Sequence, residues 1–455
     1  FIVGDECEAH GGKLRGEPSK YLDAAIHCLP GNTRIYLEDG ESVPIEELVS
    51  KRQRGLKVLS GDGLSTETAT IVGYDERLAR EKWVDIYTER GLRITASENH
   101  RIPCLASDLS IEWKRADDIK RSDFLLTLRA VGGGSERKRV YNFEACYLAG
   151  LIASDGCIPK TGSVRIGFSN MDKSILARFE AAVLKLFPDA KITHSMSQTC
   201  PQWIAYGSDI VNLIEKIEAC ILGLSREEKI DWLRGYADGD GGFTESKEGF
   251  GCLTFSTMSP EDTDRVRRML LDIGIFASIH RRPKSVRSFP GGYTSKCKPS
   301  SLLFVTGYEQ IAKFGQLVGF RQVVRARKIK WFLRQNYSRQ RRDRFRIPIA
   351  QFLDTLIKKY NLPVQKILKD NRSVSHIRLG DYFPSRETAE QIYTTLCKLK
   401  ITEARQLRAV LDSPFIPVGV VRLKKRKPTP GEKCYDLKTS SGTFVAESIL
   451  VHNSF

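Results

Sequence analysis

The sequence lacks the patterns of a disulfide-stapled, zinc-binding or membrane-spanning protein. Its 11 cysteines are an odd number and none stands in a Cys-x-x-Cys pair, so we expect neither a disulfide framework nor a structural zinc site. No apolar run approaches the length that crosses a bilayer, and the chain begins at Phe1 with neither an initiator Met nor a basic-then-apolar signal. These absences predict a piece of a longer protein that works in the reducing cytoplasm, with no membrane partner.

The first part of the chain has a small net negative charge, and the rest has a large net positive charge. Residues 1–130 carry 19 basic and 23 acidic residues, whereas the remainder carries 53 basic and 32 acidic residues. A chain of 455 residues with 41% apolar content can bury two or three cores. The first part is therefore not built for a polyanion, and the rest is.

The two ends of the chain share one texture. Alternating runs such as Thr33–Leu37 and Leu92–Thr95 predict short strands from Cys28 to about residue 130, and similar runs return from Ile416. The Gly-rich stretch 132–135 is expected to be a linker. Before Cys28, an apolar strand ends in Asp5-Glu6, which loosely resembles a nucleotide-hydrolysis motif.

The middle of the chain contains an internal repeat. Tyr147–Gly156 resembles Trp232–Gly241, and Ile166–Met171 resembles Leu253–Met258, at offsets of 85 and 87 residues. Such a repeat predicts two similar helix-and-strand units in tandem.

Residues 321–346 form a basic run with interspersed aromatic residues, and it holds 11 basic residues and one acidic residue. Helical patterns follow to about residue 412. A solvated basic helix is the plain interpretation of such a run, and a DNA-binding segment is the other. The DNA-contact candidates are Arg325, Lys328, Lys330, Arg334, Arg339, Arg341, Arg342, Arg344 and Arg346.

The two ends of the inserted stretch together resemble an intein, a self-splicing insert. Cys28 opens the first β segment, and His452-Asn453 closes the second just before the hydroxyl residue Ser454. Between them, the segment 91–100, ending in Ser97-Glu-Asn-His100, is similar to the family's Thr-x-x-His block, and Tyr435-Asp436-Leu437 is similar to its late Asp block. The resemblance implies a β-rich Hedgehog/intein-type module whose partners are the host flanks in cis.

The intein resemblance implies a role for each of these residues, in a reaction that needs no cofactor. A thiol is the best side-chain nucleophile for an amide, so Cys28 would convert the preceding peptide bond to a thioester, assisted by His100 and Ser97. Ser454 would then take over the acyl group. Asn453 would cyclise with help from His452 and release the insert. Gly442 stands where the family often has a late His, which would leave more acid–base work to Asp436.

The central repeat resembles the LAGLIDADG homing endonucleases. Leu148–Gly156 matches seven of the nine signature positions, and Leu233–Gly241 matches five. Small residues such as Gly150 and Gly235 would let the two helices approach closely. The resemblance implies a monomer that cuts the uninterrupted double-stranded host site, with strands near 163–169 and 301–306 in the major groove.

Two helix-terminal acids, Asp155 and Asp240, would meet at the seam between these helices. Paired carboxylates suit a hard cation, expected to be Mg²⁺, and the carbonyls of Ser154 and Gly239 are expected as further ligands. Asp238 is another candidate, although the first copy has Ala153 there. The plain alternative is that both terminal acids only cap buried helices.

The predicted fold class is multidomain: an all-β splicing module interrupted by an α+β endonuclease and a small basic α-rich domain. The host flanks are predicted at residues 1–27 and 454–455, and the splicing module at residues 28–130 and 416–453. The endonuclease is predicted at residues 136–320, with repeats at about 145–225 and 230–320. The basic accessory domain is predicted at residues 321–412. Two alternatives stay open, a splicing-only intein with an inactive endonuclease and a fragment of a nucleotide-hydrolysing host enzyme.

Overall fold

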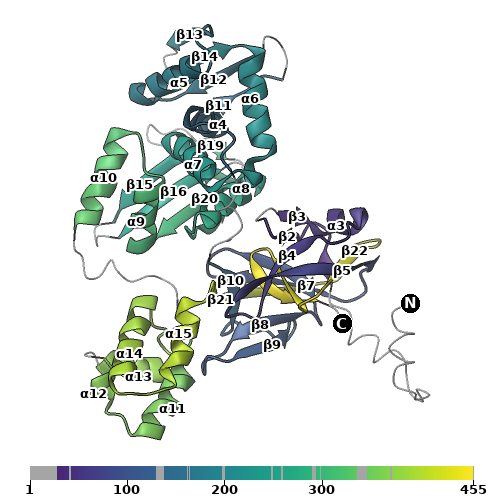
Figure 1. The fold of residues 1–455 in the computed structure, drawn as a ribbon, viewed down its shortest axis with the longest axis vertical. Coiled ribbons are helices and arrows are strands. Elements are labelled where there is room, and N and C mark those ends of the chain that lie inside the picture. The colour runs from purple at the N-terminus through teal and green to yellow at the C-terminus, as the bar shows by residue number, and fades with distance from the viewer. Residues whose placement is uncertain are drawn as a thin grey trace.

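The structure is a computed structural model. It describes residues 28–39, 42–129, 138–160, 162, 164–196, 200–246, 250–257, 260–288, 294–297, 299–335, 346–368 and 371–453. The predicted flanks, including Asp5, Glu6 and Ser454, and the predicted linker 132–135 lie outside these residues. Figure 1 shows three bodies: a β-rich body that contains the first and the last described strands, a helix-and-sheet body, and a small helical body. None of the described helices is long and apolar enough to cross a bilayer.

The β-rich body is built from two separated stretches of sequence, as predicted. The first stretch supplies strands β1 (Leu29–Pro30), β2 (Arg34–Tyr36), β3 (Ser42–Pro44), β4 (Lys57–Gly61), β5 (Thr66–Leu78), β6 (Trp83–Thr88), β7 (Arg93–Ser97), β8 (Arg101–Leu105), β9 (Ile111–Arg115) and β10 (Phe124–Leu128). The second supplies β21 (Phe415–Arg426), β22 (Lys433–Thr439), β23 (Thr443–Ala446) and β24 (Ile449–His452). Their sheets run in the orders β1-β22-β5-β4 and β3-β2-β23-β24-β10-β21-β6-β7.

The expectation of an all-β module is wrong in one place. Residues Ile45–Lys51 form the helix α3, in which Ile45, Leu48 and Val49 are buried at helical spacing. The short apolar cluster is too brief to separate from a strand by sequence alone.

Strands β10 and β21 close the β-rich body across the whole insertion. They pair antiparallel from Phe124 opposite Gly419 to Leu128 opposite Phe415. The residues between 128 and 415 are therefore an insertion into a single β unit.

The helix-and-sheet body contains two copies of the same topology. The first copy consists of α4 (Phe143–Asp155), β11 (Gly156–Cys157), β12 (Arg165–Ser169), α5 (Lys173–Leu186), β13 (Lys191–Met196), β14 (Pro201–Tyr206) and α6 (Ser208–Ala219). The second consists of α7 (Arg226–Asp240), β15 (Gly241–Glu245), β16 (Gly251–Thr257), α8 (Pro260–Asp272), β17 (Ser278–Arg282), β20 (Ser300–Thr306) and α9 (Tyr308–Leu317). The sheet orders correspond, β11-β12-β14-β13 and β15-β16-β20-β17, and the second copy adds a hairpin of β18 (Ser285–Ser288) and β19 (Thr294–Cys297).

The basic helix α10 (Val323–Arg334) belongs to this body, which corrects the boundary predicted at residue 320. Its Ile329 and Phe332 are buried in the same core as both repeats. Phe332 also packs edge-on against Phe243 of β15. Most basic residues of the helix, namely Arg327, Lys328, Lys330 and Arg334, are exposed, which is why the composition suggested a separate domain.

The helical body comprises α11 (Ala350–Tyr360), α12 (Val364–Ile367), α13 (Asn371–Arg378), α14 (Arg386–Lys398) and α15 (Ala404–Asp412). Its apolar residues share one core with the neighbouring edge of the β-rich body, including Leu126 and Phe415. This helical body therefore covers about residues 346–412, within the stretch predicted as a basic accessory domain.

Candidate functional site

The Cys28 junction is buried and held by the strand that carries the predicted Thr-x-x-His block. Cys28 is 1% exposed, and its backbone N–H donates to Ser97 Oγ at 3.0 Å. The N–H of Ser97 returns a bond to the Cys28 carbonyl at 2.9 Å. Ser97 Oγ in turn donates to Asn99 Oδ1 at 2.7 Å. The nitrogen of the bond before Cys28 is thus fixed by a hydroxyl group.

The Cys28 sulfur lies between a second thiol and a guanidinium group. Arg77 donates to Cys28 Sγ from Nε at 3.3 Å and from Nη2 at 3.2 Å. Contact with the Cys434 thiol and burial raise the pKa of Cys28, while Arg77 opposes that rise. The thiol is therefore protonated at rest, with a cation beside it that would stabilise a developing thiolate.

His100 and Asp436 are both placed at this junction. His100 is fully buried, and its N–H donates to the Ser97 carbonyl at 2.9 Å. Asp436 is 3% exposed, and its charge helps to raise the pKa of Cys28. The three residues predicted for the first reaction step, Cys28, Ser97 and His100, are thus neighbours, and Asp436 lies close to Cys28.

The second junction is formed by the end of β24 and the loop before β23. His452 Nδ1 contacts the carbonyl oxygen of Asn453, and burial lowers the pKa of His452. The Asn453 Nδ2 donates to the Thr439 carbonyl at 3.3 Å, and its backbone N–H donates to the Gly442 carbonyl at 3.0 Å. The side-chain amide is therefore ordered beside its own carbonyl.

Gly442 does occupy the place that faces Asn453. A Cβ atom at Gly442 would lie 3.8 Å from Asn453 Oδ1, but the φ of Gly442 is +81°, which disfavours a side chain. Thr439 and the Gly442 carbonyl contact Asn453 there instead.

A single strand touches both junctions. Residue Cys434 of β22 lies opposite Pro30 in the pairing with β1, and Thr439 at the other end of β22 contacts Asn453. Arg77, Cys434 and Thr439 were missed by sequence reasoning. They come from distant strands and carry no motif, although Cys434 is directly before the predicted late block.

The other candidate site lies at the seam of α4 and α7. A Cβ at Gly150 would lie 2.0 Å from the Trp232 carbonyl oxygen, and one at Gly235 would lie 2.1 Å from that of Tyr147. The two backbones therefore touch, as predicted, and only glycine fits at the crossing.

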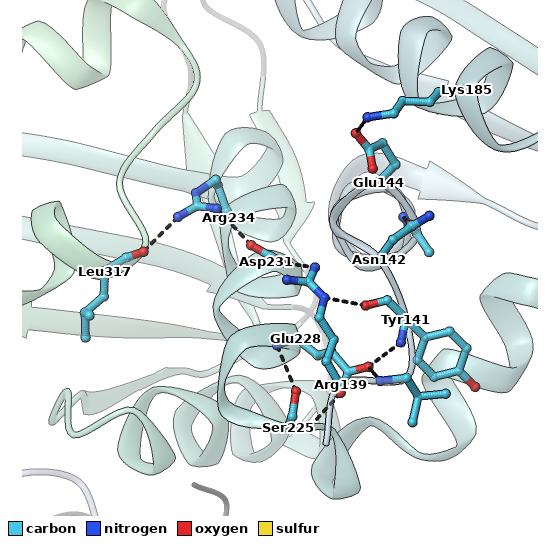
Figure 2. A network of polar contacts seen from close by, with 12 residues as sticks. Arg139, Tyr141, Asn142, Glu144, Lys185, Ser225, Glu228, Asp231, Arg234 and Leu317 are labelled. Atoms are coloured by element: carbon cyan, nitrogen blue, oxygen red, sulfur yellow. Dashed lines mark hydrogen bonds and ion pairs between the residues drawn. The ribbon is translucent and has the colours of Figure 1, made fainter. Parts of the chain in front are cut away.

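The starts of these two helices are joined by a polar network, which Figure 2 shows. The Glu228 carboxylate accepts from the N–H groups of Val140 at 2.7 Å and Tyr141 at 2.5 Å. Arg139 pairs with Asp231 at 2.6 Å, and Arg234 pairs with Asp231 at 2.9 Å. This network fixes the helix starts, so the helix ends are fixed relative to each other.

Asp155 and Asp240 lie at those ends and influence each other. Burial first, and then the charge of Asp155, raise the pKa of Asp240 to about 7. Burial also raises the pKa of Asp155, which accepts from Asn170 Nδ2 at 3.1 Å. Two carboxylates that repel each other in a half-buried seam are suited to a divalent cation. Among the described residues, no group of three or more His, Cys, Asp or Glu side chains is placed to hold a metal ion.

Asp238 and Arg325 have structural partners near the seam. Asp238 accepts from Tyr147 Oη at 2.8 Å and from the Arg321 N–H at 2.8 Å, so it ties α7 to α4 and to the start of α10. Arg325 donates from Nη1 to the Asp238 carbonyl at 2.9 Å and to that of Gly239 at 3.4 Å. The guanidinium of Arg325, a residue predicted to contact DNA, thus lies at the C-terminal end of α7. Ser154 Oγ donates to the Leu151 carbonyl at 2.8 Å.

The predicted DNA-contact residues fall into three groups. Lys328, Lys330 and Arg334 are exposed on α10. Arg346 is exposed and lies 3.7 Å from Glu89 of the β-rich body. Arg339, Arg341, Arg342 and Arg344 lie outside the described residues.

Comparisons with known proteins match the middle of the chain to a family. The family model described as a LAGLIDADG-like domain matches residues 142–218 and 227–334. The second matched segment ends with α10, in agreement with the packing of that helix.

Several curated relatives are similar to this chain over a small part of their own length. They include the replication factor C small subunit of Methanocaldococcus jannaschii, 26% identical over 56% of this chain and 14% of the relative. The ribonucleoside-diphosphate reductase large subunit of Invertebrate iridescent virus 6 is 22% identical over 73% of this chain and 33% of the relative. The replicative DNA helicase DnaB of Rhodothermus marinus is 31% identical over 33% of this chain and 15% of the relative. The chain thus spans a third or less of each.

Solved structures with partial likeness include the homing endonuclease I-DmoI in complex with DNA and Ca, at a TM-score of 0.32 and 15% identity over 42% of this chain and 97% of that one. The TvoVMA intein has a TM-score of 0.20 and 18% identity over 22% of this chain and 70% of that one. Residues 142–218 and 227–334 are thus similar to the LAGLIDADG-like domain family, within a chain whose junction residues and interrupted β module resemble those of an intein.

Proposed function

We propose that the chain excises itself as the segment 28–453 and joins its two flanks. The observation that carries this proposal is the pair of junctions: a buried thiol whose own amide nitrogen is held by Ser97, and a terminal Asn whose amide is ordered beside a carbonyl that His452 contacts. Both ends of the excised segment are thus prepared for bond breaking within one β module.

In the first step, Cys28 Sγ attacks the carbonyl carbon of residue 27, and the bond from that carbon to the Cys28 nitrogen breaks. The thiol proton leaves the sulfur and the nitrogen gains a proton, so the amine is a competent leaving group. His100 supplies that proton, Ser97 orients the nitrogen, and Arg77 stabilises the sulfur as charge develops. The acyl group then passes to the Ser454 hydroxyl.

In the last step, Asn453 Nδ2 attacks the carbonyl carbon of Asn453 and breaks its bond to residue 454. His452 polarises the carbonyl oxygen, and the Thr439 carbonyl accepts a hydrogen bond from the attacking nitrogen. The attacking nitrogen loses one proton, and the leaving nitrogen of residue 454 gains one. The ester that joins the flanks then rearranges to the more stable amide.

The range of relatives supports an insert. A replication factor, a reductase and a helicase have unrelated names, and the chain matches a small part of each. A mobile segment inserted in different hosts would produce this pattern. A fragment of a nucleotide-hydrolysing enzyme remains a prediction from Asp5 and Glu6, and a sequence upstream of Phe1 would test it.

The test is expression of the chain with longer flanks, followed by mass spectrometry. A ligated flank product with a free insert of residues 28–453 is the expected result. Recovery of only the unprocessed precursor would contradict the splicing proposal.

We also propose that the LAGLIDADG-like domain cuts double-stranded DNA with the help of Mg²⁺. Asp155 and Asp240 would hold the ion, which would activate water and stabilise the leaving oxygen of the phosphodiester. The Gly239 carbonyl is a weaker candidate ligand than predicted, since Arg325 also donates to it. Nicking assays on a duplex with the uninterrupted host site would test cutting. No cutting at any divalent-ion concentration would favour a splicing-only intein.

The accessory domain is proposed to be a second DNA contact. Only residues 368–370 separate α12 from α13, and both pack inward through Ile367, Val374 and Ile377. Two short helices joined this closely are typical of a helix-turn-helix, whose second helix enters the major groove. Ser375 and His376 lie on the exposed side of α13.

Fluorescence anisotropy with a host-site duplex tests this contact. Ser375→Glu with His376→Glu should weaken binding at least tenfold through charge repulsion, while Thr394→Glu on an exposed part of α14 should not.

For the basic run, replacing Arg339, Arg341, Arg342, Arg344 and Arg346 by Gln should flatten the salt dependence of log K by about 4–5 units. An unchanged slope would mean that the basic run is a solvated surface that does not contact DNA.

A further inference from the structure

The turn that leads to the second junction is strained. Strands β23 and β24 are joined only by Glu447 and Ser448, since Ala446 pairs with Ile449. Both turn residues are left-handed, with φ of 51° and 68°. Two-residue hairpins with this backbone normally use Asn-Gly, because other side chains crowd the carbonyl groups. The sequence of this turn therefore opposes its own conformation, and other contacts must hold it.

Part of that support comes from the β-rich body itself. The Glu447 carboxylate accepts from the Arg34 N–H at 2.8 Å. The Ser448 carbonyl accepts from the Leu128 N–H at 2.9 Å and from Thr127 Oγ1 at 2.7 Å. Ser448 Oγ also lies 2.7 Å from Tyr36 Oη.

The rest comes from α8 of the endonuclease domain. Arg267 is 3% exposed, and its Nη1 donates to Ser448 Oγ at 3.1 Å. Its Nη2 is held by Asp264 at 3.0 Å. The next residue, Arg268, also pairs with Asp264 and stacks over the Tyr36 ring at 5.5 Å. The buried guanidinium of Arg267, in the endonuclease domain, thus donates a hydrogen bond to the strained Glu447–Ser448 turn of the β-rich body.

The turn determines where the reacting residues lie. It sets the register in which Thr443 faces His452, and it leads to the bond from the Asn453 N–H to the Gly442 carbonyl. A slip of one residue would move His452 to the opposite face of the hairpin and take Asn453 away from Thr439.

We propose that Arg267 is a positioning residue for release of the second flank: the endonuclease domain clamps the Glu447–Ser448 turn and so keeps Asn453 in its reactive place. This rests on the proposed splicing function. It adds that the endonuclease domain is a working part of the splicing module and acts on its second junction and not on its first.

Two parent variants of the full chain with its flanks allow release at each junction to be measured separately. In Cys28→Ala only release of the second flank is measured, and in Asn453→Ala only thiol-induced release of the first. Arg267→Met should slow the former about tenfold, the change expected for one hydrogen bond to a charged group, and change the latter less than twofold. Lys229→Met is the matched control, since Lys229 forms an equally buried ion pair with Asp272 of α8 at 2.7 Å and does not contact the turn. It should leave both rates within twofold.

A compensating double substitution in the turn distinguishes a loss of positioning from a general loss of stability. Glu447→Asn with Ser448→Gly supplies a turn that favours positive φ without the clamp, so Arg267→Met should have little effect in that background. Equal losses at both junctions, or no rescue, would overturn the proposal. Ser448→Ala, which removes the acceptor and leaves α8 intact, should reproduce the slower release if Arg267→Met fails to fold.

If the Cys28→Ala parent does not release the second flank, the splicing proposal fails. The proposed contact between Arg267 and the Glu447–Ser448 turn is then tested by hydrogen exchange. Arg267→Met should then speed exchange of the Leu450 and Val451 amides by at least tenfold. Unchanged exchange would overturn the clamp as well.

Discussion

The Cys28 junction and the seam of Asp155 and Asp240 both raise the pKa of an ionisable group, but with different neighbours. At the junction, a neighbouring thiol and burial raise the pKa of Cys28, while Arg77 contacts the sulfur. At the seam, burial and a second carboxylate raise the pKa of Asp240 to about 7. At the junction a side chain of the protein, Arg77, supplies the positive charge beside the sulfur. The seam leaves repulsion between like charges, which a cation would relieve.

The largest effect is expected from removing the nucleophile. Cys28→Ala leaves no group that can attack the preceding carbonyl, so thioester formation should stop entirely while DNA cutting continues. Mass spectrometry after thiol treatment measures the first and a nicking assay the second. Cys397→Ala, on an exposed part of α14, is the control and should splice normally. Normal ligation by Cys28→Ala would refute the role of Cys28.

Substituting either aspartate of the seam should reduce DNA cutting without affecting splicing. Asp240→Asn or Asp155→Asn removes one of two charges from the proposed ion site, so cutting should fall at least a hundredfold with splicing unchanged. Asp189→Asn, an exposed acid of the same domain, should cut at the normal rate. Normal cutting by both seam variants would make the acids simple helix caps.

The close approach of the two helices can be broken without touching an acid. Gly150→Ala places a methyl group against the Trp232 carbonyl oxygen, so the domain should lose about 2–3 kcal/mol of unfolding free energy. Gly315→Ala in α9 is the matched change, because its Cβ would meet only side-chain atoms at 3.2 Å and beyond. It should be near neutral. Urea denaturation of the two variants measures the difference.

The smallest expected effect concerns pH at the second junction. Burial lowers the pKa of His452 below its ordinary value of 6.5, and the charged ring polarises the Asn453 carbonyl most. Release of the second flank should therefore accelerate as pH falls, with its midpoint below 6.5. Trp113 packs edge-on against His452 at 5.1 Å, so Trp113→Ala should expose the ring and move the midpoint upward. A midpoint that stays in place would contradict burial as the cause.

The sequence predicted the ends of the module and the paired helices because their chemistry is local. Gly150 and Asp155 stand at fixed spacing within one helix, and Cys28 and Asn453 stand at the edges of a β texture. Arg77 and Thr439 could not be predicted, since only strand pairing brings them to the junctions. The α10 boundary was obtainable: Ile329 and Phe332 lie three residues apart, at the spacing of a buried helix face.

Nothing near Arg267 signalled its contact with Ser448, because that contact spans two domains. The left-handed Glu447–Ser448 turn was equally hidden, since neither residue type favours it. Interfaces between an insert and its host module depend on surfaces that no local pattern records.

The pairing of β10 with β21 also fixes an order of events during synthesis. The sheet that holds both junctions cannot close until the ribosome has made the residues between 128 and 415. At about 5–20 residues per second, this delay is roughly 15–60 seconds. The inserted domains have that interval to fold before their ends are joined, which lowers the entropic cost of bringing the distant strands together. The proposed splicing reaction therefore cannot begin until nearly all of the insert has been synthesised.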